Sequence, residues 1–207
     1  MRAFHNDPAI KRKYLRRVRA HRLADDIKHG FYWQGGKGCA VGCTIHGGEH
    51  RQYETELGIP QVLARLEDRI FEGTANGFAQ LWPERFLRAI PVGADLSNVW
   101  PRWAVWMLTD EVHGVLRFAQ NEGQREAIQA VADLYALLLA GADVSPECWR
   151  EGRKAANAAN AADAAAAAAY ADADADAAAA YAAAADAAAT FYEAAAEKLL
   201  TLLRTSK

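Results

Sequence analysis

The chain has 207 residues, which is enough for one ordinary domain with an appendage or for two small domains, each with a buried core. Its mean hydropathy of -0.19 fits a soluble protein, and no stretch is long and apolar enough to suggest a membrane span. The N-terminal segment contains no uninterrupted apolar region of the kind found in signal peptides, so we expect a cytoplasmic protein.

The formal net charge of -2 at pH 7 hides an uneven distribution. Residues 1 to 30 hold nine Lys or Arg against three Asp, a balance of +6, whereas residues 155 to 197 hold seven acids and no base. Separated blocks of opposite charge can attract each other, steer a partner or lie on two solvated faces.

The first predicted helix begins at Asp7, because Asp accepts hydrogen bonds from the free amides of a first helical turn and Pro8 loses none there. We expect this helix to run to about Lys28. Its apolar residues recur at helical spacing and leave a basic outer face, which is a candidate surface for a partner. The arginines of this face include Arg12, Arg16 and Arg19.

The segment 30–58 is predicted to be a structured loop or to contain a very short helix, because six glycines lie within residues 35–48. Four helices should follow, since apolar residues recur there at helical spacing between Pro and Gly breakers. Their expected ranges are 60–71, 83–90, 101–119 and 124–140. No alternating run is long enough for a strand, so the sequence predicts an all-α helical bundle over residues 1–144.

A separate alanine-rich segment, 145–207, should begin with Ser145 as N-cap and Pro146 as the first helical residue. No Gly or Pro follows Gly152, so roughly 55 residues should be helical, with a length near 80 Å at about 1.5 Å per residue. A globule of the preceding residues is only about 40 Å across. The helix therefore projects toward a partner or folds back, and residues 172–176, where Asp alternates with Ala, are its weakest stretch.

Tyrosines recur every eleven residues in this segment, at Tyr170, Tyr181 and Tyr192. Eleven residues make almost three whole helical turns, so these tyrosines share one stripe beside small alanines. The stripe favours close packing against another helix, which predicts a protein partner or a homo-oligomer formed through the C-terminal helix.

Four side chains with the spacing C-x3-C-x2-H-x3-H, Cys39, Cys43, His46 and His50, predict a metal site, because thiolate and imidazole are ligands of tetrahedral zinc. Offsets of 0, 4, 7 and 11 would face one way on a helix. The glycines oppose a long helix, however, and the ligands are closer together than in zinc-finger spacings. The side chains that could replace one of the four are His5, His21, His29 and Glu54.

A second interpretation of the same segment is nucleophilic catalysis. Glycines and Lys37 precede Cys39, so Cys39 could begin a short helix, where the helix dipole and a nearby positive charge lower a thiol pKa. His46, His50 or the distant His113 could then act as the base. The run QGGKGCAVGC distantly resembles the papain-type pattern but departs from it in spacing and lacks an aromatic residue after the second cysteine. The third interpretation is structural, with both cysteines buried as small hydrophobic residues.

Two further features have structural explanations. The adjacent acids Glu67 and Asp68, and Asp110 and Glu111, are candidates for acid and base work, although such pairs on helices are usually solvated or paired with arginines. Cys148, one turn into the last predicted helix, is expected in the core.

The strings GKGCAVGCTIH, YETELGIPQVLARLEDRIFEG and FLRAIPVGADL, together with the terminal tract of alanine, tyrosine and aspartate, resemble a family of uncharacterised bacterial and phage-associated proteins over nearly the whole chain. The resemblance brings no established activity and therefore implies no catalytic residue. It implies a context, since small phage and prophage proteins often bind host factors, including defence systems.

The leading prediction is a protein-binding module of phage or prophage origin that inhibits a host system. One alternative is a Cys/His-dependent hydrolase or transferase, with Cys39 or Cys43 as nucleophile and His46 or His50 as base. The other is a zinc-stabilised nucleic-acid binder. Zinc is the cofactor that these residues suggest, and whether the protein is an enzyme stays open.

Overall fold

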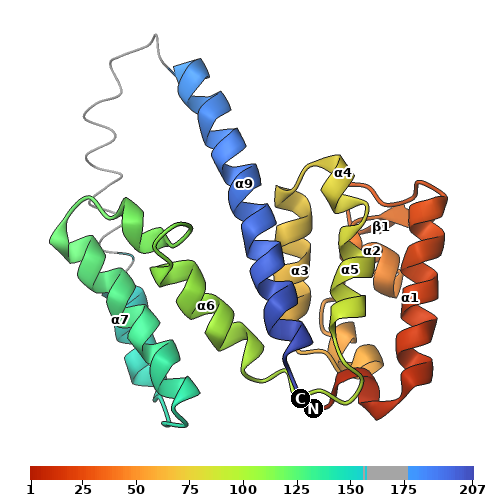
Figure 1. Ribbon diagram of the computed structural model, residues 1–207, viewed down its shortest axis with the longest axis horizontal. Helices are drawn as coiled ribbons and strands as arrows, with labels where there is room; N and C mark the ends of the chain where they lie inside the picture. The colour runs from red at the N-terminus through yellow and green to blue at the C-terminus, as the bar shows by residue number, and fades with distance from the viewer. Residues whose placement is uncertain (156, 158–176) are drawn as a thin grey trace. The chain divides into compact units, whose positions relative to one another are not determined.

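The computed structural model describes residues 1–155, 157 and 177–207, and it confirms the all-α class (Figure 1). In this part of the chain the only strands are β1 (Trp33–Gln34) and β2 (Lys37–Gly38), which pair antiparallel with Trp33 opposite Gly38. Within the same residues, no helix is both long and apolar enough to cross a membrane.

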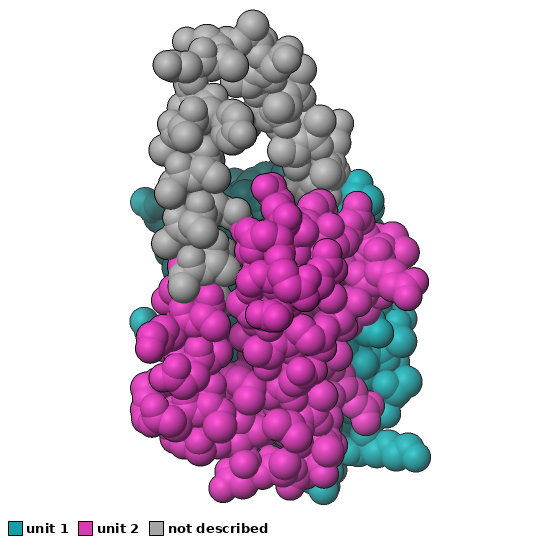
Figure 2. All heavy atoms as spheres, turned by 90° about the vertical axis from the view of Figure 1, so that its left-hand side faces the viewer, with its two compact units in different colours: residues 1–100, 188–207 teal, residues 101–187 magenta. Residues whose placement is uncertain are grey.

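Contacts divide the chain into two compact units, which Figure 2 shows in different colours. Unit 1 comprises residues 1–100 and 188–207, and unit 2 comprises residues 101–187. These limits differ from the two segments expected from the sequence, 1–144 and 145–207. The end of the alanine-rich segment therefore belongs to the same unit as the Cys/His loop.

Unit 1 consists of helices, short helical turns and the two short strands. Its first elements in chain order are η1 (Ala3–Asn6), α1 (Pro8–Leu23), β1, β2, α2 (Ala40–Ile45), η2 (Tyr53–Leu57), α3 (Gln61–Gly73), α4 (Asn76–Ala79) and α5 (Trp82–Ala89). The end of α9 (Ala177–Arg204) completes the unit, with Leu199, Leu200 and Leu203 fully buried. The amide of Asp95 donates to the carbonyl of Lys207 over 2.8 Å, which ties the C-terminus to the unit near the N-terminus (Figure 1).

The first helix begins as predicted but ends earlier. The Asp7 side chain accepts a hydrogen bond of 2.7 Å from the amide two residues on, which confirms the predicted N-cap. The helix stops at Leu23 rather than near residue 28, because Asp25 takes a left-handed φ of 55° and the turn brings Ile27 into a bridge with Gly38. Long-range pairing thus replaces the last predicted helical turn.

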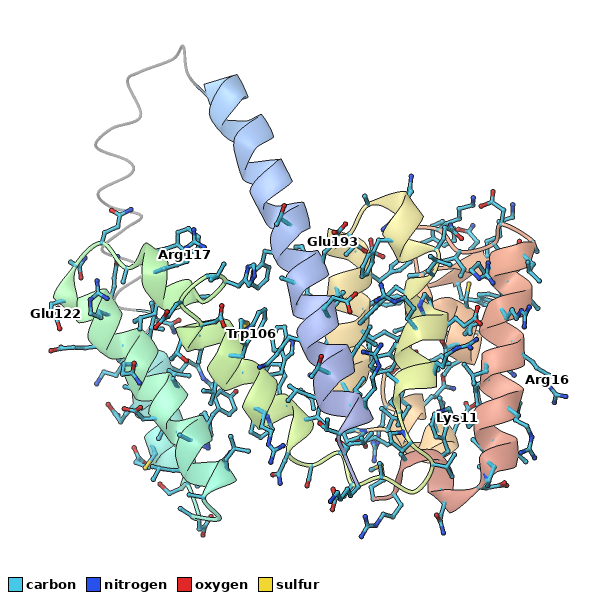
Figure 3. All side chains as sticks on the ribbon, viewed as in Figure 1. Lys11, Arg16, Trp106, Arg117, Glu122 and Glu193 are labelled. Carbon is cyan, nitrogen blue, oxygen red and sulfur yellow. The ribbon has the colours of Figure 1, made fainter. Side chains whose placement is uncertain are left out.

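The basic face of α1 is exposed, as the sequence indicated. Arg12, Arg16 and Arg19 all lie on it, and Figure 3 shows Arg16 pointing away from the helix. Their exposure leaves them available to a protein or a nucleic acid, so this partner surface stays a prediction.

The glycine-rich segment folds around one close backbone approach, and α2 is the very short helix expected there. The amide of Cys39 donates to the carbonyls of Phe31 and Tyr32 over 3.0 and 3.2 Å. A Cβ at Gly38 or Gly42 would lie only 1.8 or 1.5 Å from the Tyr32 carbonyl oxygen. Glycine is therefore required at both positions, because any side chain would separate residues 31–33 from α2.

α3 confirms the predicted apolar stripe, since Leu63, Leu66 and Ile70 are all buried. At the end of this helix a Cβ on Gly73 would lie 2.2 Å from Cδ2 of Tyr192, so glycine makes room there for a ring of α9. Tyr192 is one of the predicted interaction residues, and its contact with Gly73 lies within unit 1.

The predicted long helix is described only in part. Residues 146–155 are helical, and α9 forms the C-terminal end. Tyr170 and the alternating stretch 172–176 lie outside the described residues, and so does the side chain of Tyr181. The continuity of the helix and the shared tyrosine stripe therefore stay predictions.

Unit 2 is built from helices: α6 (Val99–Thr109), which begins just before its limit, then η3 (Val115–Phe118), α7 (Glu122–Leu139) and the helix over 146–155. The prediction of a single helix over residues 101–119 is wrong. The Asp110 side chain accepts hydrogen bonds from the amides of Val112 and His113, over 3.1 and 2.8 Å, and ends α6 in a turn. Cys148 is exposed, so its predicted place in the core is also wrong.

We expect Gly42→Ala to destabilise unit 1 by about 2–3 kcal/mol or to prevent its folding, because the backbone of residue 32 must move away from α2. Chemical denaturation followed by circular dichroism measures the effect. The matched control is Gly77→Ala, where a Cβ meets no atom within 4 Å, so stability should change by less than about 1 kcal/mol. Equal stability of the two variants would contradict the requirement for glycine at α2.

Candidate metal centre

The structure divides the Cys/His motif between the two ends of α2. Cys39 is the N-cap of this helix, and its Sγ accepts from the amide of Gly42 over 3.5 Å. His46 is the C-cap, in the left-handed region with φ 56°. Cys43 lies between them, fully buried, with its thiol donating to the carbonyl of Gly38 over 3.3 Å. The motif therefore supplies different side chains to different surroundings.

Cys39 and His50 meet through Asp68 of α3. The Cys39 thiol donates to Oδ1 of Asp68 over 3.3 Å, and Nε2 of His50 lies 3.2 Å from Oδ2 of the same carboxylate. The side chains of His50 and Asp68 are only 15% and 16% exposed. Two of the four predicted ligands are thus brought together by a carboxylate that is 29 positions from Cys39.

Glu72 joins this cluster from one helical turn further along α3. One ligand atom from each of Cys39, Asp68 and Glu72 lies within 4.8 Å of the other two. The Glu72 oxygens also accept from the amide of Gly30, over 3.3 and 3.2 Å, which holds the carboxylate in place. The three side chains form a group that can bind a metal ion.

A pocket of about 470 Å³ opens beside this group. It is lined by Tyr32, His50, Arg65, Asp68, Arg69 and Glu72. Glu72 is exposed, Asp68 is half-buried and Cys39 is 1% exposed, so the cluster runs from the surface into the core. A ligand in the pocket would reach the carboxylates before the thiol.

Both thiols of the motif are held in their protonated form. Burial is the main cause that raises the pKa of Cys39 well above its usual value, the Asp68 carboxylate raises it further, and the Gly42 amide opposes the shift. Burial likewise raises the pKa of Cys43 to about 12. A protonated, buried thiol is a poor nucleophile, so this arrangement does not favour the predicted thiolate catalysis. A bound cation would instead favour the thiolate, because metal binding displaces the thiol proton.

Glu67 is a buried acid directly behind the cluster. It is 0% exposed, and its Oε2 accepts a hydrogen bond of 2.6 Å from the Tyr53 hydroxyl, whereas Oε1 has no partner among the described residues. Burial is the largest cause that raises the pKa of Glu67 to about 8, the charge of Asp68 adds to it, and the Tyr53 hydrogen bond opposes it. Glu67 is therefore mostly protonated at pH 7.

The protonation of Glu67 predicts how stability depends on pH. The folded pKa of about 8 exceeds the ordinary value of 4.5, so the folded state binds more protons between these values. The stabilisation is fully present below about pH 4.5 and is lost as the pH rises toward 8. In the metal-free protein, Glu67→Gln should therefore flatten the fall in the free energy of unfolding across this window, measured by urea denaturation. Glu49→Gln, at an exposed position, is the control, and a wild-type slope in Glu67→Gln would disprove the assignment.

Sequence reasoning paired Asp68 with the wrong acid. Adjacent residues on a helix point about 100° apart, whereas residues at i and i+4 share a face. Glu67 consequently lies in the core, and Asp68 acts with Glu72. The i, i+4 spacing of these two acids on a predicted helix was a signal available in the sequence.

The side chains considered as replacement ligands are engaged elsewhere. Nε2 of His5 and Nε2 of His29 lie 3.1 and 3.0 Å from backbone carbonyl oxygens. Glu54 accepts from the amide of Gln61 over 3.0 Å. His21 alone of this set contacts the motif, through His46.

Comparison with known proteins adds no family to this picture. No family model, no curated protein and no solved structure matches the chain.

Proposed function

We propose that the protein binds a zinc ion through Cys39, Asp68 and Glu72 and uses it to activate water against an anionic substrate in the adjacent pocket. The observation that carries this proposal is the convergence of three ligand atoms within 4.8 Å from two segments that are far apart in the sequence. A thiolate in the set favours Zn²⁺ over Mg²⁺ and Ca²⁺, which prefer oxygen ligands alone.

Among the described residues the group has three ligands, which supports a catalytic rather than a structural role. Structural zinc sites are closed by four protein ligands, whereas catalytic sites have three and leave one position for water or substrate. Asp68 and Glu72 both line the pocket, so an ion between them is reached from it. Zinc in such a site lowers the pKa of bound water toward neutrality.

The remaining pocket residues suit an anionic substrate. Arg65 and Arg69 line the same pocket and are exposed, and a guanidinium group binds phosphate or carboxylate through paired hydrogen bonds. His50 lines the pocket and contacts Oδ2 of Asp68, so it orients this ligand.

Metal analysis tests the proposal. Purified protein should contain stoichiometric zinc, and Co²⁺ in its place should give a thiolate-to-cobalt charge-transfer band because Cys39 is a ligand. Cys39→Ser should abolish this band, and His50→Gln should weaken zinc binding about tenfold because it orients a ligand. Cys148→Ser, which changes an exposed thiol of unit 2, should leave both readouts unaltered. Zinc content that is unaffected by Cys39→Ser would overturn the proposal.

Protein binding is a second candidate function, and it rests on the connection between α6 and α7. Val112 and Phe118 in this connection are 61% and 67% exposed. Apolar side chains gathered in one exposed segment commonly mark an interaction site. We propose this segment as the contact with a protein partner, while a role against a host system rests on the sequence resemblance alone.

A second copy of the chain is the simplest partner to test. If the copies associate through this segment, sedimentation velocity at rising concentration should show a dimer that Phe118→Ser weakens roughly tenfold or more. Leu23→Ser, at a position of unit 1 that is 71% exposed, is the control and should leave the dimer unchanged. A protein that stays monomeric at every concentration would exclude self-association through this segment.

A further inference from the structure

The other end of α2 carries a second cluster, which the proposed zinc centre does not use. His46 follows this helix, and its Nε2 lies 2.9 Å from Nε2 of His21, a residue of α1. His46 holds a left-handed φ of 56°, where glycine is the usual residue and other side chains are strained. The chain thus places an imidazole in a conformation that a glycine would adopt more easily.

A carboxylate fixes the orientation of His21. Oδ2 of Asp26 lies 3.2 Å from Nδ1 of His21, so this nitrogen carries a proton and donates it. The lone pair of Nε2 then accepts the proton on Nε2 of His46, and a bound metal would displace this proton to Nδ1 of His46. A histidine that binds a metal through one ring nitrogen almost always donates its other N–H to such a carboxylate or carbonyl.

Trp33 fixes the second imidazole. Its ring stacks on His46 with centroids 4.4 Å apart and planes at 15°, and it meets the edge of His21 at 5.3 Å. The two histidine rings are nearly perpendicular, at 81°. Both imidazoles are therefore oriented by neighbours rather than by each other alone.

The surroundings of His46 favour its neutral imidazole, which is the form that binds a metal. Burial is the largest cause that lowers its pKa, Arg17 and His21 lower it further, and Glu56 opposes them. Arg17 is held in place, since its guanidinium donates to the carbonyl of Thr44 over 2.8 Å. With Asp26 beside His21, the surroundings contain carboxylates as well as this cation.

We propose that His21 and His46 form a second metal site, independent of the Cys39 cluster, for a divalent ion that prefers imidazole in a square-planar or octahedral geometry, such as Ni²⁺ or Cu²⁺. Two nitrogens bound at about 2.05 Å with an angle of 90° are about 2.9 Å apart. The two Nε2 atoms are 2.9 Å apart, which is also a hydrogen-bond distance, and the ring centroids are 5.1 Å apart, so both rings would have to turn slightly for their lone pairs to converge on an ion. Water completes the coordination, because His46 lies at the surface.

Binding of Ni²⁺ to the full-length protein tests this site. Isothermal titration calorimetry of the Asp68→Asn variant, which lacks a ligand of the first cluster, should still show Ni²⁺ binding. His21→Asn and His46→Asn in this background should each weaken it at least tenfold, and Asp26→Asn about tenfold. Asn tolerates the left-handed conformation at position 46, so the fold should survive. His113→Asn, which changes a histidine of unit 2, should bind like its parent.

Two further measurements leave both His21 and His46 in place. Bound Ni²⁺ should quench the fluorescence of Trp33, and Trp33→Phe should lose this quenching while it keeps the calorimetric signal. In the Asp68→Asn variant, Zn²⁺ as a diamagnetic probe should shift the ¹⁵N resonances of Nε2 in His21 and His46 and leave Nδ1 of His21 protonated. Ni²⁺ affinity unchanged in both histidine variants, or unmoved Nε2 resonances, would reduce the pair to a hydrogen bond and overturn the proposal.

Discussion

The contact between the backbone of Tyr32 and α2 is the constraint on which the chemistry of unit 1 depends. Gly38 and Gly42 bring no Cβ between them, so the Tyr32 carbonyl accepts a hydrogen bond from the amide of Cys39. This contact sets the position of the whole short helix. Cys39 at one end and His46 at the other are therefore placed by the same backbone packing, and neither end can shift without the other.

α3 gives adjacent acids opposite environments. One side of this helix is a core stripe, and Glu67 shares that burial, so removal from water outweighs its hydrogen bond to Tyr53 and keeps it neutral. Asp68 is turned about 100° away, toward Cys39 and the pocket. Because Glu67 is mostly protonated at neutral pH, it repels the Asp68 side chain only weakly.

The sequence predicted the features that depend on local rules, and it failed where distant segments decide. Asp7 capped α1 as expected, because capping needs only the next few amides. The predicted end of α1 was wrong because Ile27 pairs with Gly38, and this contact outweighs the helix propensity of the residues that follow Leu23. The break in the helix predicted over 101–119 followed a local rule that was overlooked, since the Asp110 side chain competes for backbone amides.

The sequence predicted which types of residue form the candidate sites, but it did not predict which distant residues they contact. The four side chains of the motif would face the same way only if the segment formed a helix of about three turns. α2 has 6 residues, about 9 Å at 1.5 Å per residue, so Cys39 and His46 at its two ends cannot share an ion. Each end instead meets the helix packed beside it, which supplies Asp68 from α3 and His21 from α1. No local pattern reveals such pairings. Because the two clusters have no side chain in common, any coupling between them passes through the backbone of α2.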